Sequence, residues 1–496
     1  MRRIVTILLL LCSLFSMAIV PPRDPSKWDE WQQQVVARRA PMVQQAVGQR
    51  TIIPRIPVIL VSFSDFEFTT PKADVDSMFN GANWTKDGAT GSLRQYFYDQ
   101  SMGAYSPQFD VFGPVTLSKG YGYYGKGSNT SGNVGHMVTE ACALVDDSVD
   151  FSLYDSDDDG KVDLVYVYYA GFGENDKANA YVQTLIPTWG DLVWPAYWNV
   201  VSAGASSDPR TFDGKTIYAC EYSNELDAYV TTETTKVPAG IGTACHEFGH
   251  AIGLPDLYVT RGGSTHKTLG AWDLMCYGLY NNDTHTPPSL SAYERFYMGW
   301  MTPTLIVNPD TLRLEHIATS NQAFMVVETD THNMDGLHPD TTVFYLLENR
   351  QRTGWDIDVP GSGMLLTRIN YQPSLWTGNA VNNTDGNQGV DIIEADGKTP
   401  ATNTSAGFYG KPGDAFPCDT ITEYLGIPDH AITNITMNDG VITFTYRGGK
   451  IPTDPTTAFI MPADDRRTFK TMENGQLLIH SNGRTYSVYG LEIKTY

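Results

Sequence analysis

Apolar and polar residues alternate in two different ways along the chain, and the first pattern fills its first three-fifths. Short apolar runs that suit strands, such as 56–63 and 164–169, are separated by stretches of helical periodicity, such as 91–100 and 135–145. Strands and helices that follow one another in this way are typical of a sheet covered by helices. We therefore predict an α+β domain over residues 53–303, with an α/β domain as the alternative.

After Pro303 the pattern changes to short runs of alternating apolar and polar residues, which is the pattern of half-buried strands. These runs lie at 312–317, 324–329, 343–348, 364–370 and 435–446. The last run contains the turn sequence Asn438-Asp439-Gly440, which suits a tight connection between two strands. The pattern predicts a β-sandwich domain over residues 304–450.

The last residues, 451–496, read as a linker and a small tail. Residues 451–462 are rich in proline and threonine, which favours an extended connection. In the tail, two strand-like runs within 476–488 flank Asn482-Gly483, which predicts one β-hairpin. We interpret this tail either as a sorting signal or simply as a last hairpin.

The N-terminal residues have the pattern of an export signal. Met1-Arg2-Arg3 precede an apolar run from 4 to 15, and the small residues Ser16 and Ala18 suit cleavage after Ala18. We predict a signal peptide over residues 1–18, and therefore a protein that is secreted or held at the cell surface. Nothing later in the sequence approaches the length of a transmembrane span.

Residues 19–52 form a polar and basic segment with apolar residues, including Trp28 and Trp31, at roughly helical spacing. Arg38-Arg39 and Arg50 offer cleavage points ahead of the first strand. We interpret the segment as a pro-segment; the alternative is a helix that simply packs on the domain.

Composition then narrows the classes of function. The chain has 496 residues, 41% of them hydrophobic and 18% charged, which indicates a folded protein of about three domains. Its formal net charge is −22. A surface this negative repels phosphate backbones, so we expect no nucleic-acid partner.

The segment 239–258 contains the strongest chemical signal. On a helix, His246 and His250 lie one turn apart, about 6 Å along the axis, so both imidazoles can reach one tetrahedral Zn²⁺. Glu247 is placed to touch a metal-bound water as a general base. Gly253 can end the helix in a left-handed conformation and bring Asp256 to the metal as third ligand.

Three other residues remain alternatives for the third ligand. Glu294 lies 44 residues after His250, and His266 and His285 lie between them. Downstream of the helix, Met275 fits a methionine-containing turn under the metal, and Tyr277 is placed to stabilise a tetrahedral intermediate. Ordinary core packing is the alternative for both.

These motifs resemble the immune inhibitor A-like bacterial metallopeptidases. The resemblance rests on 240–258, on Trp272-Asp-Leu-Met275 and on 291–300, with weaker likeness elsewhere between residues 54 and 420. It implies a secreted, zinc-dependent endopeptidase with a metzincin-like catalytic domain, made as a zymogen and followed by a β-rich domain. It also implies a disulfide between Cys220 and Cys245, with buried free thiols as the alternative.

An acidic loop upstream predicts a second metal site. Its carboxylates and one carbonyl stand at positions one, three, five, seven and nine of a calcium-binding loop: Asp155, Asp157, Asp159, Lys161 and Asp163. Position twelve is Tyr166 instead of the usual glutamate, so we predict a structural Ca²⁺ site closed by a carboxylate from elsewhere, and not a sensor.

The sequence therefore predicts a secreted zinc endopeptidase, active as a monomer on proteins or peptides. In this hypothesis Glu247 is the catalytic base and Tyr277 assists it. The alternative is a secreted β-rich adhesin or glycan-binding protein with a vestigial or glycoprotein-directed protease domain. Trp355 and Trp376 are then the candidates for contact with glycans, with burial in the core as the alternative.

Overall fold

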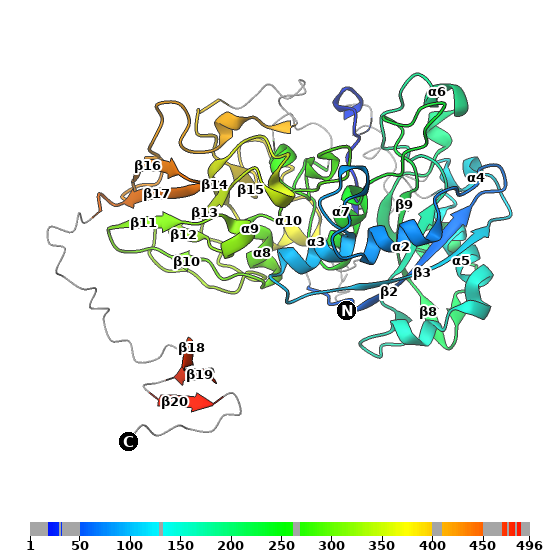
Figure 1. Ribbon diagram of the computed structural model, residues 1–496, viewed down its shortest axis with the longest axis horizontal. Helices are drawn as coiled ribbons and strands as arrows, with labels where there is room; N and C mark the ends of the chain where they lie inside the picture. The colour runs from blue at the N-terminus through cyan, green and yellow to red at the C-terminus, as the bar shows by residue number, and fades with distance from the viewer. Residues whose placement is uncertain are drawn as a thin grey trace, which may run out of the picture. The chain divides into compact units, whose positions relative to one another are not determined.

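A computed structural model describes residues 18–28, 31, 50–127, 132–260, 268–398 and 409–449, together with tail strands between 469 and 487. The chain forms two compact units, Met1–Gly449 and Lys450–Tyr496 (Figure 1). Among the described residues, no helix combines the length and the apolar character that crossing a bilayer requires.

The first unit begins with a mixed six-stranded sheet. Its strands, in spatial order, are β1 (Ala18–Ile19), β6 (Ala196–Asn199), β9 (Ala219–Asn224), β5 (Val165–Tyr169), β2 (Arg55–Ser62) and β3 (Gln108–Thr116). The strands from β9 to β3 are parallel, whereas β6 runs antiparallel to β9, and β1 runs antiparallel to β6. β6 would be the edge strand without β1.

Helices complete this region, which is a mixed α/β arrangement. They are α2 (Lys72–Asn80), α3 (Leu93–Gln100), α4 (Tyr121–Gly125), α5 (Val134–Val145), α6 (Val182–Leu185), α7 (Gly242–Ala251) and α8 (Ala292–Met298). Ser92 caps α3 by accepting the N–H of Gln95 at 3.1 Å. A small sheet of β4 (Lys161–Val162), β8 (Lys215–Ile217) and β7 (Thr211–Phe212) lies after the acidic loop.

Two further sheets follow residue 303. The first contains β10 (Thr304–Leu305), β12 (Phe324–Val327), β13 (Phe344–Arg350), β14 (Gly363–Ile369) and β15 (Val390–Ile392). The second contains β11 (Asp310–Leu314), β17 (Val441–Tyr446) and β16 (Ile432–Asn438), and the short helices α9 (Ile317–Ser320) and α10 (Pro373–Thr377) accompany them. The predicted strand pairs on both sides of Asn438-Asp439-Gly440 are confirmed.

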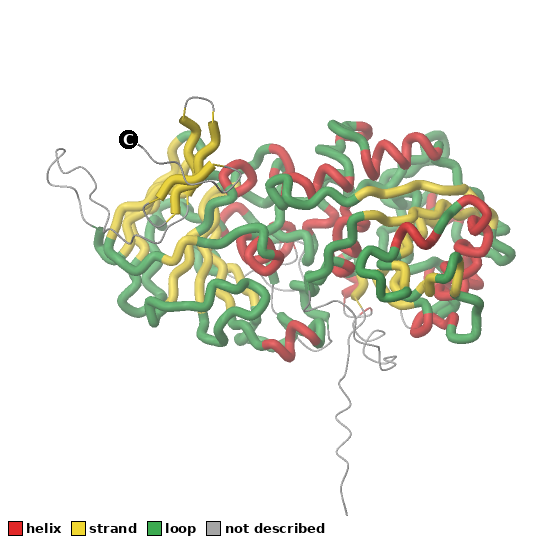
Figure 2. The backbone as a smooth tube through the Cα atoms, turned by 90° about the horizontal axis from the view of Figure 1, so that it is seen from below, coloured by secondary structure: helices red, strands yellow, loops and turns green. Residues whose placement is uncertain are grey.

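One apolar core contains side chains from both of these sheets. Phe324 of β12 packs edge-on against Phe444 of β17, with ring centroids 5.7 Å apart. Figure 2 shows the strands of Met1–Gly449 in separate groups, joined by helices and loops. Both groups belong to one compact unit, so the domain boundary at 303 stays a prediction.

A buried arginine ties the downstream sheet to the peptide chain below α7. Arg350 of β13 forms ion pairs with Glu348 at 3.0 Å and Asp356 at 2.6 Å. Its Nη2 also donates to the carbonyl oxygens of Trp272 at 3.1 Å and Ser289 at 3.0 Å. Nη2 therefore holds two segments of the upstream region, while the ion pairs with Glu348 and Asp356 fix the guanidinium group in place.

Two predictions from the sequence are wrong. Trp355 and Trp376 are 6% and 1% exposed, so they pack in the core and cannot form a glycan-binding surface. Cys220 on β9 and Cys245 on α7 are free thiols, as are the three other described cysteines. Burial raises the pKa of both thiols above the usual range, which makes them inert core residues.

The tail unit contains one strand more than predicted. Strands β18 (Phe469–Glu473), β19 (Gln476–Ser481) and β20 (Arg484–Ser487) form an antiparallel sheet in the order of the sequence. The pairing of Ser481 with Arg484 confirms the predicted hairpin. The linker at 451–462 lies outside the described residues.

Candidate metal centre

Helix α7 brings two imidazoles together. His246 and His250 are fully buried, and their Nε2 atoms lie 3.2 Å apart. Oδ1 of Asp256, also fully buried, lies 3.2 Å from Nε2 of His246 and 3.1 Å from Nε2 of His250. The three predicted zinc ligands thus present one donor atom each to a common point.

Hydrogen bonds on the far side of each ring fix the direction of these donors. Nδ1 of His246 lies 2.9 Å from the carbonyl oxygen of Leu274, and Nδ1 of His250 lies 2.8 Å from that of Leu254. A carbonyl oxygen only accepts, so each Nδ1 carries the proton and each neutral ring presents the lone pair of Nε2. This is the tautomer that a metal ligand needs.

The size of this triangle fits a zinc ion. Four ligands at about 2.0–2.1 Å in tetrahedral arrangement stand roughly 3.3 Å from one another, close to the distances of 3.1 and 3.2 Å between the donors here. Two imidazole nitrogens and one carboxylate oxygen are also the donor set of catalytic zinc sites, which leave the fourth position open.

Gly253 ends α7 as predicted and turns the chain toward Asp256. Its φ of +117° lies in the region that side chains disfavour. The rival third ligands are used elsewhere. Glu294 closes a capping box with Ser291 at the start of α8, and Nδ1 of His285 lies 2.8 Å from the carbonyl oxygen of Asp283. His266 lies outside the described residues.

Glu247 is buried next to these donors. Its Oε2 accepts the N–H of Tyr197 on β6 at 2.6 Å, and the N–H of Val20 also donates to its carboxylate. Burial raises the pKa of Glu247 to about 8, and Asp256 adds to the rise while His250 opposes it. The side chain is thus held between α7 and the edge of the sheet.

Met275 packs against Gly249 of α7, and its place in a turn below a metal stays a prediction. Its N–H donates to Oδ1 of Asp273 at 2.8 Å, and its carbonyl oxygen accepts the N–H of Leu257 at 2.8 Å. A Cβ placed on Gly249 would stand only 2.8 Å from its sulfur. Tyr277 is buried and packs against the ring of Tyr409 at 5.8 Å.

Comparison with known proteins finds one related family of peptidases. Residues 70–301 match the model of the immune inhibitor A peptidase M6 catalytic domain. Residues 70–301 are therefore similar to the catalytic domain of the immune inhibitor A family of M6 peptidases. This confirms the resemblance that the sequence motifs carried.

Two curated relatives of the M6 domain show how far the likeness extends. The chain is 27% identical over 287 residues to the pre-pro-metalloprotease PrtV of Vibrio cholerae serotype O1, covering 54% of this chain and 28% of that protein. It is 24% identical over 294 residues to immune inhibitor A of Bacillus thuringiensis subsp. alesti, covering 52% of this chain and 41% of that protein. The matches thus span less than half of each relative.

An asparagine from outside the M6 match completes the centre. Asn379 donates from Nδ2 to Oδ2 of Asp256 at 2.6 Å, and its Oδ1 accepts the N–H of Asp256 at 2.7 Å. Tyr258 adds a second neighbour, because it hydrogen-bonds Asp256 and its ring stacks on His246 at 6.3 Å. Sequence reasoning missed both residues. Tyr258 stood within the recognised segment, whereas nothing in the sequence marked Asn379.

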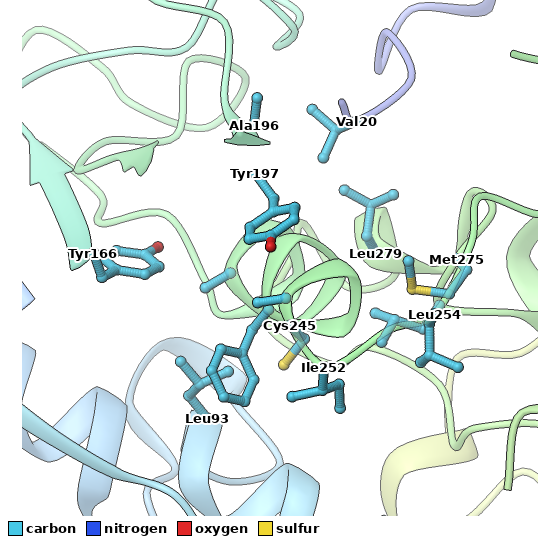
Figure 3. Close-up of a cluster of buried hydrophobic side chains, with 14 of the residues drawn as sticks. Val20, Leu93, Tyr166, Ala196, Tyr197, Cys245, Ile252, Leu254, Met275 and Leu279 are labelled. Carbon is cyan, nitrogen blue, oxygen red and sulfur yellow. The ribbon is translucent and has the colours of Figure 1, made fainter. Parts of the chain in front are cut away.

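The N-terminal segment of the chain lies across the M6 centre. Ala18 and Ile19 pair with Tyr197 and Ala196 of β6. Figure 3 shows Val20 above α7, close to Tyr197 and Leu279. Val20 is fully buried, and its carbonyl oxygen accepts the indole N–H of Trp194 at 3.0 Å.

Aromatic residues of the N-terminal segment also pack over the candidate metal centre. Trp28 packs against Tyr277 at 5.9 Å and Tyr258 at 6.0 Å, and Trp31 packs against Trp194 at 6.2 Å. Both tryptophans are buried. The predicted cleavage points Arg38-Arg39 lie outside the described residues.

The acidic loop gathers three of its predicted ligands. Asp155, Asp157 and Asp159 bring one carboxylate oxygen each within 4.8 Å of the others. Asp163 instead accepts the N–H of Ser156 at 3.1 Å. Ammonium groups also reach the loop, since Lys215 pairs with Asp155 at 2.6 Å and Lys161 with Asp159 at 2.5 Å.

Proposed function

We propose that the protein is a zinc-dependent endopeptidase that hydrolyses peptide bonds in protein substrates. The M6 match supports a peptidase. The single observation that carries the finer assignment is the buried triangle of His246, His250 and Asp256. Its donors, tautomers and spacing suit zinc, and Glu247 follows the first ligand directly in the sequence.

The residues of this centre would divide the chemistry among them. Bound zinc supplies Lewis acidity toward water and the scissile carbonyl group. Glu247 accepts the proton of the attacking water and returns it to the leaving nitrogen. Tyr277 is proposed to donate a hydrogen bond to the oxygen that becomes negative. Met275 supports the metzincin-like character of the turn below.

We also propose that the protein is exported as a zymogen, with residues 19–52 as its pro-segment. Within this segment, Ile19 pairs with the edge of β6 and Val20 donates to Glu247, where a substrate strand would have to bind. Trp28 and Trp31 bury Tyr258 and Tyr277 beneath them. The segment must therefore leave before a substrate can enter.

Calcium is proposed for the acidic loop. Three carboxylates within 4.8 Å repel one another, and a divalent cation would relieve this repulsion. The loop leads into β4 and β5, so a bound ion would fix the start of a central strand and not the chemistry at α7.

The variant Glu247→Ala tests the proposed activity. It should keep one zinc per chain and lose labelled-casein hydrolysis by at least about 100-fold, because the metal ligands stay and the base is lost. Glu233→Ala, at an exposed position of the same domain, is the matched control and should keep full activity. An active Glu247→Ala protein would refute the assigned role.

A further inference from the structure

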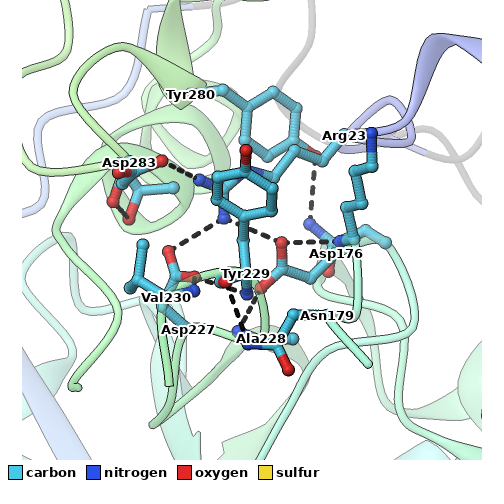
Figure 4. Close-up of polar contacts among 12 residues, drawn as sticks. Arg23, Asp176, Asn179, Asp227, Ala228, Tyr229, Val230, Tyr280 and Asp283 are labelled. Atoms are coloured by element: carbon cyan, nitrogen blue, oxygen red, sulfur yellow. Dashed lines mark hydrogen bonds and ion pairs between the residues drawn. The ribbon is translucent and has the colours of Figure 1, made fainter. Parts of the chain in front are cut away.

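The N-terminal segment inserts one arginine into a cluster of carboxylates (Figure 4). Nη1 of Arg23 donates to Oδ1 of Asp176 at 2.9 Å and to Oδ2 of Asp227 at 2.8 Å, and Nη2 donates to Asp283. Arg23 is 7% exposed and Asp227 1%. A buried guanidinium that spans three carboxylates is a specific ligand contact, and not a surface ion pair.

The carboxylates are held in place by the M6 domain itself. Oδ1 of Asp227 accepts the N–H groups of Tyr229 at 2.8 Å and Val230 at 3.1 Å. Oδ2 of Asp176 accepts the N–H of Ala228 at 2.7 Å. These bonds do not involve Arg23, so Asp176 and Asp227 keep them when the segment departs.

Two aromatic rings make the pocket suitable for a guanidinium group. The carbon Cζ of Arg23 lies 5.0 Å from the ring centroid of Tyr229 and 5.9 Å from that of Tyr280. A flat guanidinium can face these rings and still direct separate N–H groups at different carboxylates. The compact ammonium of lysine cannot make all of these contacts together.

Arg23, which fills the pocket, lies only a few residues after the part of the segment that contacts Glu247. Val20 donates to Glu247, and Arg23 follows three residues later. Ile19 pairs antiparallel with β6, whose other side is already paired with β9. A substrate strand that takes over this free edge in the same direction would carry its own side chain into the pocket.

Charge makes the emptied pocket unstable without a cation. Arg23 contributes one positive charge against three carboxylates. After its departure Asp176 and Asp227 face each other with no counter-charge from the segment, and a new cation would restore the balance. Asp176 also lines a cavity of about 590 Å³, together with Trp189 and Trp194.

We propose that Asp176, Asp227 and Asp283 form a substrate subsite that selects an arginine side chain on the C-terminal side of the cleaved bond. In the zymogen Arg23 fills this subsite. The inference rests on the proposed endopeptidase function, and it assigns to Asp227 and Asp176 a role in specificity and none in bond cleavage.

The first experiment measures peptide specificity with the full chain after it has matured to constant activity. In a peptide series, one residue at a time on either side of the scissile bond is arginine, lysine or glutamine. We expect one position on the C-terminal side at which arginine raises kcat/KM at least about tenfold over glutamine, since charge-assisted hydrogen bonds are gained. Lysine should fall between them.

Variants then connect this preference to the pocket. Asp227→Asn should reduce the arginine-to-glutamine ratio to within about threefold, because the charge-assisted hydrogen bond to arginine is lost. Asp358→Asn, at an exposed position, is the control and should keep the full ratio. An unchanged ratio in Asp227→Asn, or a preference only on the N-terminal side, overturns the proposal.

A second experiment tests the pocket without any peptidase activity. In the full chain with Arg23→Ala, millimolar ethylguanidinium should raise the melting temperature by roughly 2–4 °C, and ethylammonium should have less effect. Wild type and Arg23→Ala/Asp227→Asn should not respond. If Arg23→Ala does not respond either, the pocket does not bind guanidinium and the proposal fails. A chain that cleaves no peptide counts against the endopeptidase function alone.

Discussion

The side chain of Asn379 binds both the backbone and the side chain of Asp256, although the two residues are 123 positions apart. The amide oxygen accepts the N–H of Asp256, and the amide nitrogen donates to its carboxylate. Oδ1 of Asp256 then faces the two imidazoles. A residue beyond the M6 match thus orients one of the three candidate metal ligands.

Removing this support should weaken metal binding. Asn379 has a φ of +47°, so Asn379→Gly deletes the side chain without backbone strain. We expect zinc affinity to fall about 10–100-fold, as for other residues that orient metal ligands. Competition with a chelating dye measures the Kd. Asn308→Gly, at an exposed position, is the control, and equal Kd values for both variants would contradict the role of Asn379.

The first residue of α7 allows no side chain. A Cβ on Gly242 would lie 1.9 Å from the carbonyl oxygen of Leu279, a backbone atom that cannot turn aside. Gly242→Ala should therefore destabilise the protein by about 2–3 kcal/mol, which is typical of overpacking, and lower the melting temperature. In Gly122→Ala the nearest atom stands at 3.6 Å. That control should melt within about 1 °C of wild type.

The metal centre was predictable because its determinants are local. His246 and His250 share one helix, and Gly253 supplies the turn that returns Asp256 to them, so the spacing indicated all three residues although it left other third ligands open. The strand runs after residue 303 were predictable for the same reason, since period-two alternation is read within each strand.

Contacts between segments that are distant in the sequence could not be predicted, because no local sequence pattern marks them. Arg23 is one basic residue in a polar segment, and Asp176, Asp227 and Asp283 are spread over more than a hundred positions. Trp355 and Trp376 looked suited to a binding surface, yet composition cannot tell a buried ring from an exposed one. Cys220 and Cys245 were paired by resemblance, whereas each thiol has its own place in the core.

Calcium should stabilise the acidic loop if the proposed site exists. A calcium-selective chelator is expected to lower the melting temperature by several degrees and speed self-digestion, while zinc stays bound. Asp157→Asn should melt lower than wild type and no longer respond to the chelator.

Asp158 belongs to the same loop, but its side chain is 94% exposed and outside the three-carboxylate group. Asp158→Asn should respond like wild type. If the chelator leaves the melting curve of the wild-type protein unchanged, the calcium assignment is wrong.

Acid should loosen the N-terminal segment. Burial and the carboxylate of Asp176 raise the pKa of Asp227 to about 6, and Arg23 opposes this rise. When Arg23 leaves, the pKa rises further, so release takes up a proton. Attachment of the segment is therefore full well above pH 6 and weakens as the pH falls through about 6. Arg23 also faces Asp283, Tyr229 and Tyr280, which remain in place.

The rate at which an added protease cuts within residues 19–50 measures this release apart from global unfolding. Release of the segment and global unfolding must be measured separately, because they depend on pH in opposite directions. The stability that Asp227 contributes to folding is present below its unfolded pKa of about 4 and is lost as the pH rises through about 6. Cutting should accelerate severalfold between pH 7.5 and 5.5 in wild type. In Asp227→Asn it should be fast at both values, because the ion pair that acid would break is already gone. A rate in wild type that does not change with pH would show that Asp227 does not control the segment.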